Sequence, residues 1–361
     1  MRNIEDQITP YYDTDFNLLR WLKGHDYNID VIKPKLTNHL LFRKSDWNLD
    51  HLADGPRNQT LHKHWKSGLT GESGVVPNTI VNIEQTGSND YWGMLNTYST
   101  SDILKARVYD LESMLRAIME LEKKTGQQCS IMYIMDLTGL KMDRKLTTLV
   151  SGGLAAISAF MAEHYVEMVH SFVLVNVPTF IHTIWTLARP LLPEKTRNKV
   201  NILGANWKEE VLKLANSEVL PSYWNAEDED KFKAPIEKCV PFPESGYYKD
   251  NISREAKHLA VNAGKTGHVD VSVDEGKTLE FEVHTDGHFS FTVTLVDAEN
   301  DVKDMDTETR VYPLFSKIPG PTIVPCKDVV AAKQKGTYRF WFGNKHAWFH
   351  QLKVSYVIRV V

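Results

Sequence analysis

The sequence predicts a multi-domain protein that combines an α/β domain with an all-β domain. Apolar runs typical of buried strands alternate with helical stripes up to about residue 225, and apolar and polar residues alternate singly beyond about residue 278. The length of 361 residues leaves room for about two domains at roughly 150 residues each. A hydrophobic content of 42% with 24% charged residues is typical of a folded chain, which excludes bulk disorder.

Residues 1–65 are predicted to be an N-terminal helical region. After Asp13 or Thr14, either of which would serve as an N-cap, apolar residues recur at helical spacing: Phe16, Leu18, Leu19, Trp21 and Leu22. A second stripe at the same spacing contains Ile32, Leu36, Leu40 and Trp47. The glycines of residues 68–77 then indicate a turn region.

Residues 66–225 are predicted to form the α/β domain. Apolar runs typical of buried strands occur at 80–83, 131–136, 172–177 and 200–203. Helices are expected between them, at about 101–124 and 143–165. Near-continuous apolar strands that are separated by helices indicate a largely parallel sheet with both faces covered.

The C-terminal third is predicted to be a separate β domain. Residues 226–245 are interpreted as a linker, because an acidic run at 227–230 is followed by Pro235, Pro241 and Pro243. Residues 246–361 alternate in polarity in several runs, which predicts an antiparallel β-sandwich. Trp341, Trp348 and Phe349 lie near one of its hairpins, and we expect at least two of these rings to belong to the core.

Composition excludes several classes of function. A net charge of −4 argues against a nucleic-acid partner. The 3 cysteines are far apart, so neither a disulfide framework nor a cysteine zinc site is expected. His62 and His64 are interpreted as surface histidines, and no metal site is predicted. The N-terminus has no apolar secretory segment, which favours the cytoplasm.

The sequence contains no motif typical of an enzyme. Asp136 ends a buried strand, where α/β proteins place working residues, but a carboxylate there also caps the following turn. No serine–histidine–aspartate set or carboxylate pair at a recognisable spacing gives Asp136 a catalytic partner. We therefore predict no catalytic residues and a non-enzymatic protein.

The helix predicted after Pro178 is unusually apolar. Two adjacent stripes leave little room for a polar face, and they contain Phe180, Ile181, Ile184, Trp185, Leu187, Ala188, Leu191 and Leu192. Such a helix is either fully buried or spends time against something apolar. It is therefore either a core helix or the wall or lid of an apolar ligand cavity.

An ordered set of motifs resembles the CRAL-TRIO family. The set comprises residues 14–23 (TDFNLLRWLK), 133–140 (YIMDLTGL), 172–178 (FVLVNVP), 189–192 (RPLL), 196–200 (TRNKV), 202–204 (ILG) and 220–221 (LP). The C-terminal β domain resembles a GOLD domain. Together they are similar to the animal supernatant-protein-factor and tocopherol-associated group of secretory lipid-transfer proteins, over nearly the whole chain.

The resemblance implies that the α/β domain encloses one hydrophobic ligand, such as phosphatidylinositol, tocopherol or another isoprenoid lipid. The helix at 179–192 would be the gate over that cavity. The cavity wall would include Met132, Ile134, Leu154, Ile157, Phe160, Phe172 and Leu174, for each of which core packing is the rival interpretation. A two-chain lipid with about 30 CH₂ groups costs roughly 24 kcal/mol to expose to water, so exchange would occur at a membrane.

The resemblance also implies a phosphatidylinositol headgroup site. By motif, its contacts fall on Glu167, Lys199 and Thr196, while the position of the family's arginine is occupied by His25. A histidine is mostly neutral near pH 7, whereas an arginine grips a phosphate at any pH. The hydroxyl positions that the family uses for phosphatidylcholine fall on Ile131 and Tyr133, which favours that headgroup less.

The sequence therefore predicts a lipid-binding and lipid-transfer protein that needs no cofactor beyond its bound lipid. Its expected partners are that lipid and, transiently, intracellular membranes. The alternative is a lipid-sensing regulatory adaptor whose GOLD domain recruits protein partners.

Overall fold

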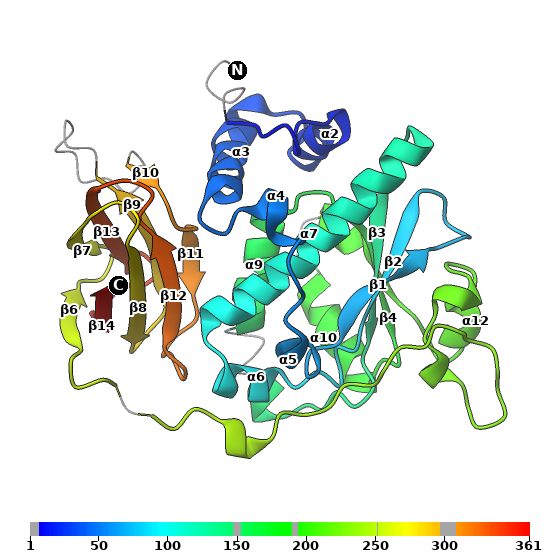
Figure 1. Ribbon diagram of the computed structural model, residues 1–361. Helices are drawn as coiled ribbons and strands as arrows, with labels where there is room; N and C mark the ends of the chain where they lie inside the picture. The colour runs from blue at the N-terminus through cyan, green and yellow to red at the C-terminus, as the bar shows by residue number, and fades with distance from the viewer. Residues whose placement is uncertain (1–6, 147–152, 190–193, 251, 297–307) are drawn as a thin grey trace.

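The computed structural model describes residues 7–146, 153–189, 194–250, 252–296 and 308–361. In Figure 1 the first helices, at residues 15–44, lie at the top, the α/β sheet and its helices at the right, and the β-sandwich at the left. This arrangement confirms the predicted α/β plus all-β class.

The first two described N-terminal helices begin at side-chain caps. Thr14, not Asp13, caps the first of them, because its hydroxyl oxygen accepts a hydrogen bond from the backbone N–H of Asn17 at 3.1 Å. Asn28 caps the next in the same way, and that helix ends before Trp47. The helices are α2 (Asp15–Gly24), α3 (Ile29–Lys44), α4 (Leu49–Leu52) and α5 (Gln59–His62).

A five-stranded sheet in the order β1-β2-β3-β4-β5 forms the α/β domain. The pairs from β2 to β5 are parallel, as predicted, and β1 runs antiparallel to β2 at one edge. The elements in chain order are β1 (Ser67–Glu72), β2 (Thr79–Glu84), α6 (Tyr91–Thr97), α7 (Thr100–Thr125), β3 (Ser130–Asp136), α9 (Gly153–His164), β4 (Val169–Val175), α10 (Thr179–Ala188), α11 (Glu194–Asn198), β5 (Val200–Ile202) and α12 (Trp207–Val211).

The glycine-rich region was expected to be a turn, and this expectation is wrong for β1. Ser67 pairs with Glu84 and Leu69 with Asn82, so the segment has a strand partner that its local sequence does not reveal. The glycines mark an irregularity within the strand, because the register shifts between Leu69 and Gly71. Gly71 has a φ of 140°, which a side chain would strain.

The C-terminal domain is a sandwich of two antiparallel sheets. One sheet has the order β10-β9-β13-β7 with β11 also on β9, and the other has the order β12-β8-β14-β6. The strands are β6 (Lys257–Val261), β7 (Thr266–Val273), β8 (Thr278–Thr285), β9 (Phe289–Leu295), β10 (Thr309–Arg310), β11 (Phe315–Ile318), β12 (Cys326–Ala331), β13 (Gly336–Gly343) and β14 (Leu352–Val360).

The segment between the domains lies against the α/β domain along much of its length. It contains the short 3₁₀ turns η2 (Ser217–Val219), η3 (Ser222–Trp224) and η4 (Glu244–Gly246). Phe232 and Phe242 are 0% and 6% exposed, and Phe242 packs in a cluster with Trp65 and Tyr91. Residues 226–245, interpreted as a linker, are therefore a connection with little regular structure that is anchored by aromatic side chains.

The two domains share one hydrophobic cluster, which we call the junction. Phe42 and Trp47, Leu104 of α7 and Phe160 of α9 pack in the same cluster as Tyr312 and Phe315 of the sandwich. Asp328 of β12 reinforces this contact, because its carboxylate accepts hydrogen bonds from Lys105, Trp47 and Tyr312.

Candidate ligand-binding site

One face of the α/β sheet is covered over its strands β3 and β4. Side chains alternate between the faces of a strand, and one set from β3 and β4 packs under the segment that contains α12. The set consists of Met132, Ile134, Val173 and Val175, none more than 1% exposed, against Val211, Leu220, Trp224 and Phe232. Met132 and Ile134, expected to line the cavity, are therefore core residues of this covered face.

The opposite face is covered at one end only. Ile131 and Tyr133 of β3 are buried there under α7. Towards the carboxyl ends of the strands, coverage is incomplete over side chains that are only half-buried: Met135, Phe172, Leu174, Val200 and Ile202. We call these five residues the open face.

The register of the sheet makes the open face continuous. Leu174 pairs with Met135 on one side and with Ile202 on the other, and Phe172 pairs with Val200. Parallel sheets are normally buried on both faces, so a continuous apolar strip that stays only half-buried is unusual. Phe172 and Leu174 thus lie on one face of the sheet, and Met132 and Ile134 lie on the other.

The predicted gate helix is α10, which starts at Pro178 directly after β4. Its more buried side carries Phe180, Ile181 and Trp185, all half-buried, and Ile184 beside them is 39% exposed. The other side carries Thr179, His182, Thr183 and Thr186, all exposed. The interpretation as a core helix is therefore wrong, and so is the expectation of an apolar surface nearly all round. Leu191 and Leu192 and the side chains of Leu187 and Ala188 lie outside the described residues.

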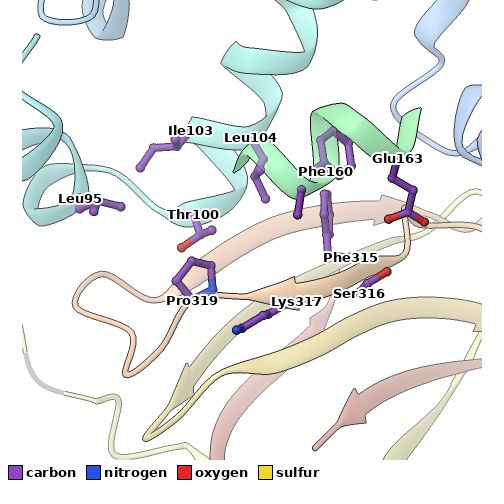
Figure 2. Close-up of a pocket in the computed structure, with 11 residues that line it drawn as sticks. Leu95, Thr100, Ile103, Leu104, Phe160, Glu163, Phe315, Ser316, Lys317 and Pro319 are labelled. Atoms are coloured by element: carbon purple, nitrogen blue, oxygen red, sulfur yellow. The ribbon is translucent and has the colours of Figure 1, made fainter. Parts of the chain in front are cut away.

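Phe160 is placed at the junction instead of in the ligand cavity. It packs against Phe42 and Phe315, with ring centroids 5.5 and 5.7 Å away. Figure 2 shows it beside a small cavity of about 70 Å³ between α7, α9 and β11. The expectation for Phe160 is therefore wrong, because its side of α9 faces the β-sandwich. Leu154 and Ile157 lie on α9, and their side chains are outside the described part of the chain.

A buried polar cluster adjoins the open face, and sequence reasoning missed it. The Tyr133 hydroxyl donates a hydrogen bond to Glu84, and Arg107 Nη2 donates to that hydroxyl at 3.0 Å. Burial raises the pKa of Tyr133, so the phenol stays protonated. Within the described part of the chain, Arg107 Nη1 has no hydrogen-bond partner. The ring of Tyr133 contacts that of Phe172, which links this cluster to the open face.

Two of the predicted headgroup residues form an ion pair. Lys199 Nζ lies 3.0 Å from Glu167 Oε2 and 3.0 Å from the carbonyl oxygen of Val169. Gly24 fits against the turn before β4 so closely that an added Cβ would lie 3.3 Å from Cγ of Glu167. His25 follows Gly24 directly, and its ring stacks on that of Trp21 with the ring centroids 5.7 Å apart.

Thr196 lies on α11, in the same part of the molecule. Its neighbour Lys195 donates hydrogen bonds to the carbonyl oxygen of Lys23 and to Asp26, which ties α11 to the end of α2. The Thr196 side chain lies outside the described residues. The ammonium group of Lys35 lies beside His25, with its Nζ 3.3 Å from His25 Nε2.

Asp136 is occupied by structural hydrogen bonds. One carboxylate oxygen accepts from the backbone N–H of Thr138, from its hydroxyl and from Asn176, and the other accepts from Tyr223 and from Trp224 at 2.8 Å. A carboxylate with so many donors caps a turn and is not free to act as a base.

The histidines at 62 and 64 were expected at the surface, and this expectation is wrong. They are 2% and 9% exposed, since His62 Nε2 lies 3.1 Å from Asp110 Oδ2 of α7 and His64 bonds the Val240 carbonyl. In the described ranges, no group of three or more histidine, cysteine, aspartate or glutamate residues is arranged to hold a metal ion. Nor does any helix of those ranges have both the length and the apolar character needed to cross a bilayer.

Sequence comparison identifies both parts of the chain. Residues 80–225 match the CRAL/TRIO domain, and residues 242–361 match a domain described as F28H7_8_C:-like, C-terminal domain. Over 328 residues the chain is 30% identical to the CRAL-TRIO domain-containing protein F28H7.8 of Caenorhabditis elegans, covering 86% of this chain and 77% of that protein. The chain belongs to the CRAL-TRIO domain family.

Two further proteins are similar to this chain at lower sequence identity. Protein ctg-1 of Caenorhabditis elegans is 20% identical over 365 residues, which cover 98% of this chain and 94% of that protein. The crystal structure of Sfh5 aligns with 64% of this chain at 17% identity and a TM-score of 0.48. Membership of the CRAL-TRIO family indicates a hydrophobic lipid ligand, and the sandwich is the β domain that accompanies CRAL-TRIO in F28H7.8.

Proposed function

We propose that this protein encloses one lipid molecule between the open face and α10 and exchanges it at membranes. The observation that carries the proposal is the half-buried apolar strip of Met135, Leu174 and Ile202, which contrasts with the covered opposite face of β3 and β4. A lipid chain lying on this strip would remove it from water, and each buried CH₂ group contributes about 0.8 kcal/mol.

In this proposal α10 is the gate. Its apolar side, with Phe180, Ile184 and Trp185, faces the ligand when closed and the bilayer when open. Its polar side, with His182 and Thr183, faces water in the closed state. A helix of this kind suits the boundary between water and acyl chains, where amphipathic helices lie.

The polar cluster would orient the ligand. Arg107 Nη1 is a buried donor without a partner in the described part of the chain, and such a group is costly unless an acceptor reaches it. An oxygen of the ligand next to Tyr133 would satisfy this donor. At the surface, Lys199 and Glu167, with Thr196 and His25 beside them, would hold a phosphoinositide headgroup when that is the lipid.

The GOLD assignment of residues 246–361 and a cytoplasmic location belong to the same proposal. Support for the first is the sandwich of two antiparallel sheets. In the adaptor alternative, the protein would bind lipid but would not move it between membranes.

The test begins with native mass spectrometry of the purified full chain, followed by extraction and identification of the bound lipid. Transfer of that lipid between donor and acceptor vesicles is then measured for wild type, Ile184→Asp and Trp185→Asp. We expect transfer to fall at least tenfold with unfolding midpoints unchanged. Thr183→Asp is the matched control, because it adds the same charge to the polar side of α10.

Loss of folding and transfer together in Ile184→Asp would remove the gate assignment. Wild-type protein that carries lipid but transfers none would favour the adaptor. Protein that carries no lipid and takes up none would refute the proposal.

A further inference from the structure

The loop between β13 and β14 exposes two adjacent aromatic side chains. Trp348 and Phe349 are 88% and 96% exposed, the highest values among the exposed large hydrophobic residues of the described chain. Trp341, the third ring considered in the sequence, is 3% exposed and lies in the sandwich. The expectation that at least two of the three rings belong to the core is therefore wrong.

The exposed rings stand on a fixed base. Asn344 is 1% exposed, and its amide donates hydrogen bonds to the carbonyl oxygens of Val261 at 3.0 Å and His350 at 2.8 Å. His346 lies 2.6 Å from the carbonyl oxygen of Ser316, and Gln351 bonds Asn262 at 2.7 Å. These contacts hold both ends of the loop, so the exposure of the rings is built into the fold.

Two neighbouring loops lie beside the loop that carries Trp348 and Phe349, and together the three loops form one surface. His350 lies 3.1 Å from Asp286, and a Cβ added to Gly287 would lie 3.3 Å from the His350 ring, so the β8–β9 loop lies beside the aromatic loop. The β11–β12 loop joins them, because Thr322 bonds Thr285 at the end of β8. That loop contributes Ile323, which is 46% exposed.

This end of the sandwich is basic although the chain is acidic. The loop segments 262–265, 286–288, 316–325 and 343–353 contain the lysines at 265, 317, 345 and 353 and a single acidic residue, Asp286. Their net charge is thus about +3 with histidines neutral, against −4 for the whole chain. All four lysines are exposed. We call this surface the aromatic-basic tip.

We propose that the aromatic-basic tip docks this protein on the surface of an anionic lipid bilayer. The rings project from a convex loop, a shape that enters a soft interface more readily than it fits a rigid protein pocket. Trp and Phe side chains favour the boundary between headgroups and acyl chains. Lysines around them attract anionic headgroups. The tip lies on the β domain, so this surface is separate from α10 and goes beyond the proposed exchange of lipid.

The experiment measures co-sedimentation of the full chain with vesicles of phosphatidylcholine alone or with 3:1 phosphatidylcholine to phosphatidylserine, a ratio on the order of that of anionic cell membranes. We expect wild type to bind the phosphatidylserine vesicles at least tenfold more tightly, and to release as salt rises. Trp348→Ser with Phe349→Ser should weaken binding at least tenfold. Lys265→Glu with Lys345→Glu should reduce binding to the level seen with phosphatidylcholine alone.

The control removes two exposed apolar side chains from the other end of the sandwich. Val360 and Val361 are 45% and 53% exposed and follow the full length of β14 from the tip, so Val360→Ser with Val361→Ser should leave binding unchanged. Lipid content is measured in every variant by native mass spectrometry. Tip-dependent binding by protein that neither carries lipid nor takes it up would support the docking surface while refuting the proposed function.

Equal binding by wild type and the Trp348–Phe349 double variant would overturn the proposal. So would a failure of wild type to bind either kind of vesicle. Self-association that the double variant abolishes, in the absence of vesicle binding, would assign the tip to a second copy of the chain and would also overturn it.

Discussion

The covered face and the open face of the α/β sheet are built from consecutive residues of the same strands, yet they differ completely in packing. Ile134 and Val173 are 0% exposed on the covered face, whereas their neighbours Met135 and Leu174 are half-buried on the open face. Local sequence on β3 and β4 is equally apolar in both directions. The difference therefore comes from what lies over each face, and in the proposed function it is this incomplete coverage that leaves apolar side chains available to a ligand.

The largest expected effect is a difference in lost unfolding free energy between a substitution on the covered face and one on the open face. Ile134→Ala should cost about 4 kcal/mol of unfolding free energy, because it opens a cavity in a filled core. Met135→Ala should cost only about 1 kcal/mol, because the site is already half-open. Urea unfolding measures both, and equal losses would mean that the two faces are equally well packed.

A second effect concerns α9, which ends at His164. His164 and His39 are buried with Nδ1 atoms 3.3 Å apart, and burial lowers the pKa of His164 to about 3 and that of His39 well below its usual value. Above about pH 6.5 these two histidines are uncharged in both the folded and the unfolded chain, so their contribution to stability does not change with pH. Between pH 6.5 and 3 the unfolded chain binds protons that the folded chain does not, so stability falls as pH falls.

From pH 7 to pH 5, His164 alone should therefore remove about 2 kcal/mol. Unfolding of wild type and His164→Leu is compared at the two pH values, and the variant should lose about 2 kcal/mol less. His51→Gln is the control, since that side chain is 71% exposed. A pH dependence that is unchanged in His164→Leu would show that His164 does not act in this way.

A third prediction tests the open face by affinity. Leu174→Asn places an amide on the apolar strip and should weaken binding of the resident lipid about tenfold, which is about 1.4 kcal/mol. Lipid occupancy is read by native mass spectrometry during titration. Asn201→Ala, at an exposed position of neighbouring β5, should change nothing. Unchanged affinity in Leu174→Asn would place the ligand elsewhere.

The smallest expected effect concerns the headgroup. Lys199→Gln should weaken phosphoinositide binding about fivefold, or about 1 kcal/mol, and leave binding of a neutral isoprenoid unchanged. Lys208→Gln breaks a comparable ion pair with Glu229 and serves as the control. Equal loss for both lipids would mean that Lys199 only stabilises the turn at Glu167.

Sequence patterns predicted where helices and strands lie better than they predicted which face of the sheet is covered. Thr14 and the apolar period of α7 carry local signals, because caps and helical stripes depend on neighbours a few residues away. Met132 and Ile134 were assigned to the cavity wrongly, since a strand that is apolar on both sides has no alternation to distinguish its faces. Only the position of α12 and the segment after it decides which side is filled.

Partners distant in sequence explain most of the other errors. His62 is buried because it forms a hydrogen bond with Asp110 on α7. Phe160 faces the β-sandwich because its ring packs against that of Phe315. At least two of Trp341, Trp348 and Phe349 were expected in the core on residue type alone, and residue type does not show which side chains lie on an exposed loop. The meeting of Glu167 with Lys199 was anticipated through the family resemblance, and the Arg107–Tyr133–Glu84 cluster was not anticipated at all.

The junction has a consequence for how this chain can be divided. Helix α9 presents Phe160 to the sandwich, and Trp47 from the N-terminal region lies among rings of the same cluster. A chain cut near residue 245 would leave these rings in water, and a sandwich expressed alone would lose their cover in turn. The two domains are therefore not interchangeable modules, and a graft of either onto another protein must carry the matching half of the junction with it.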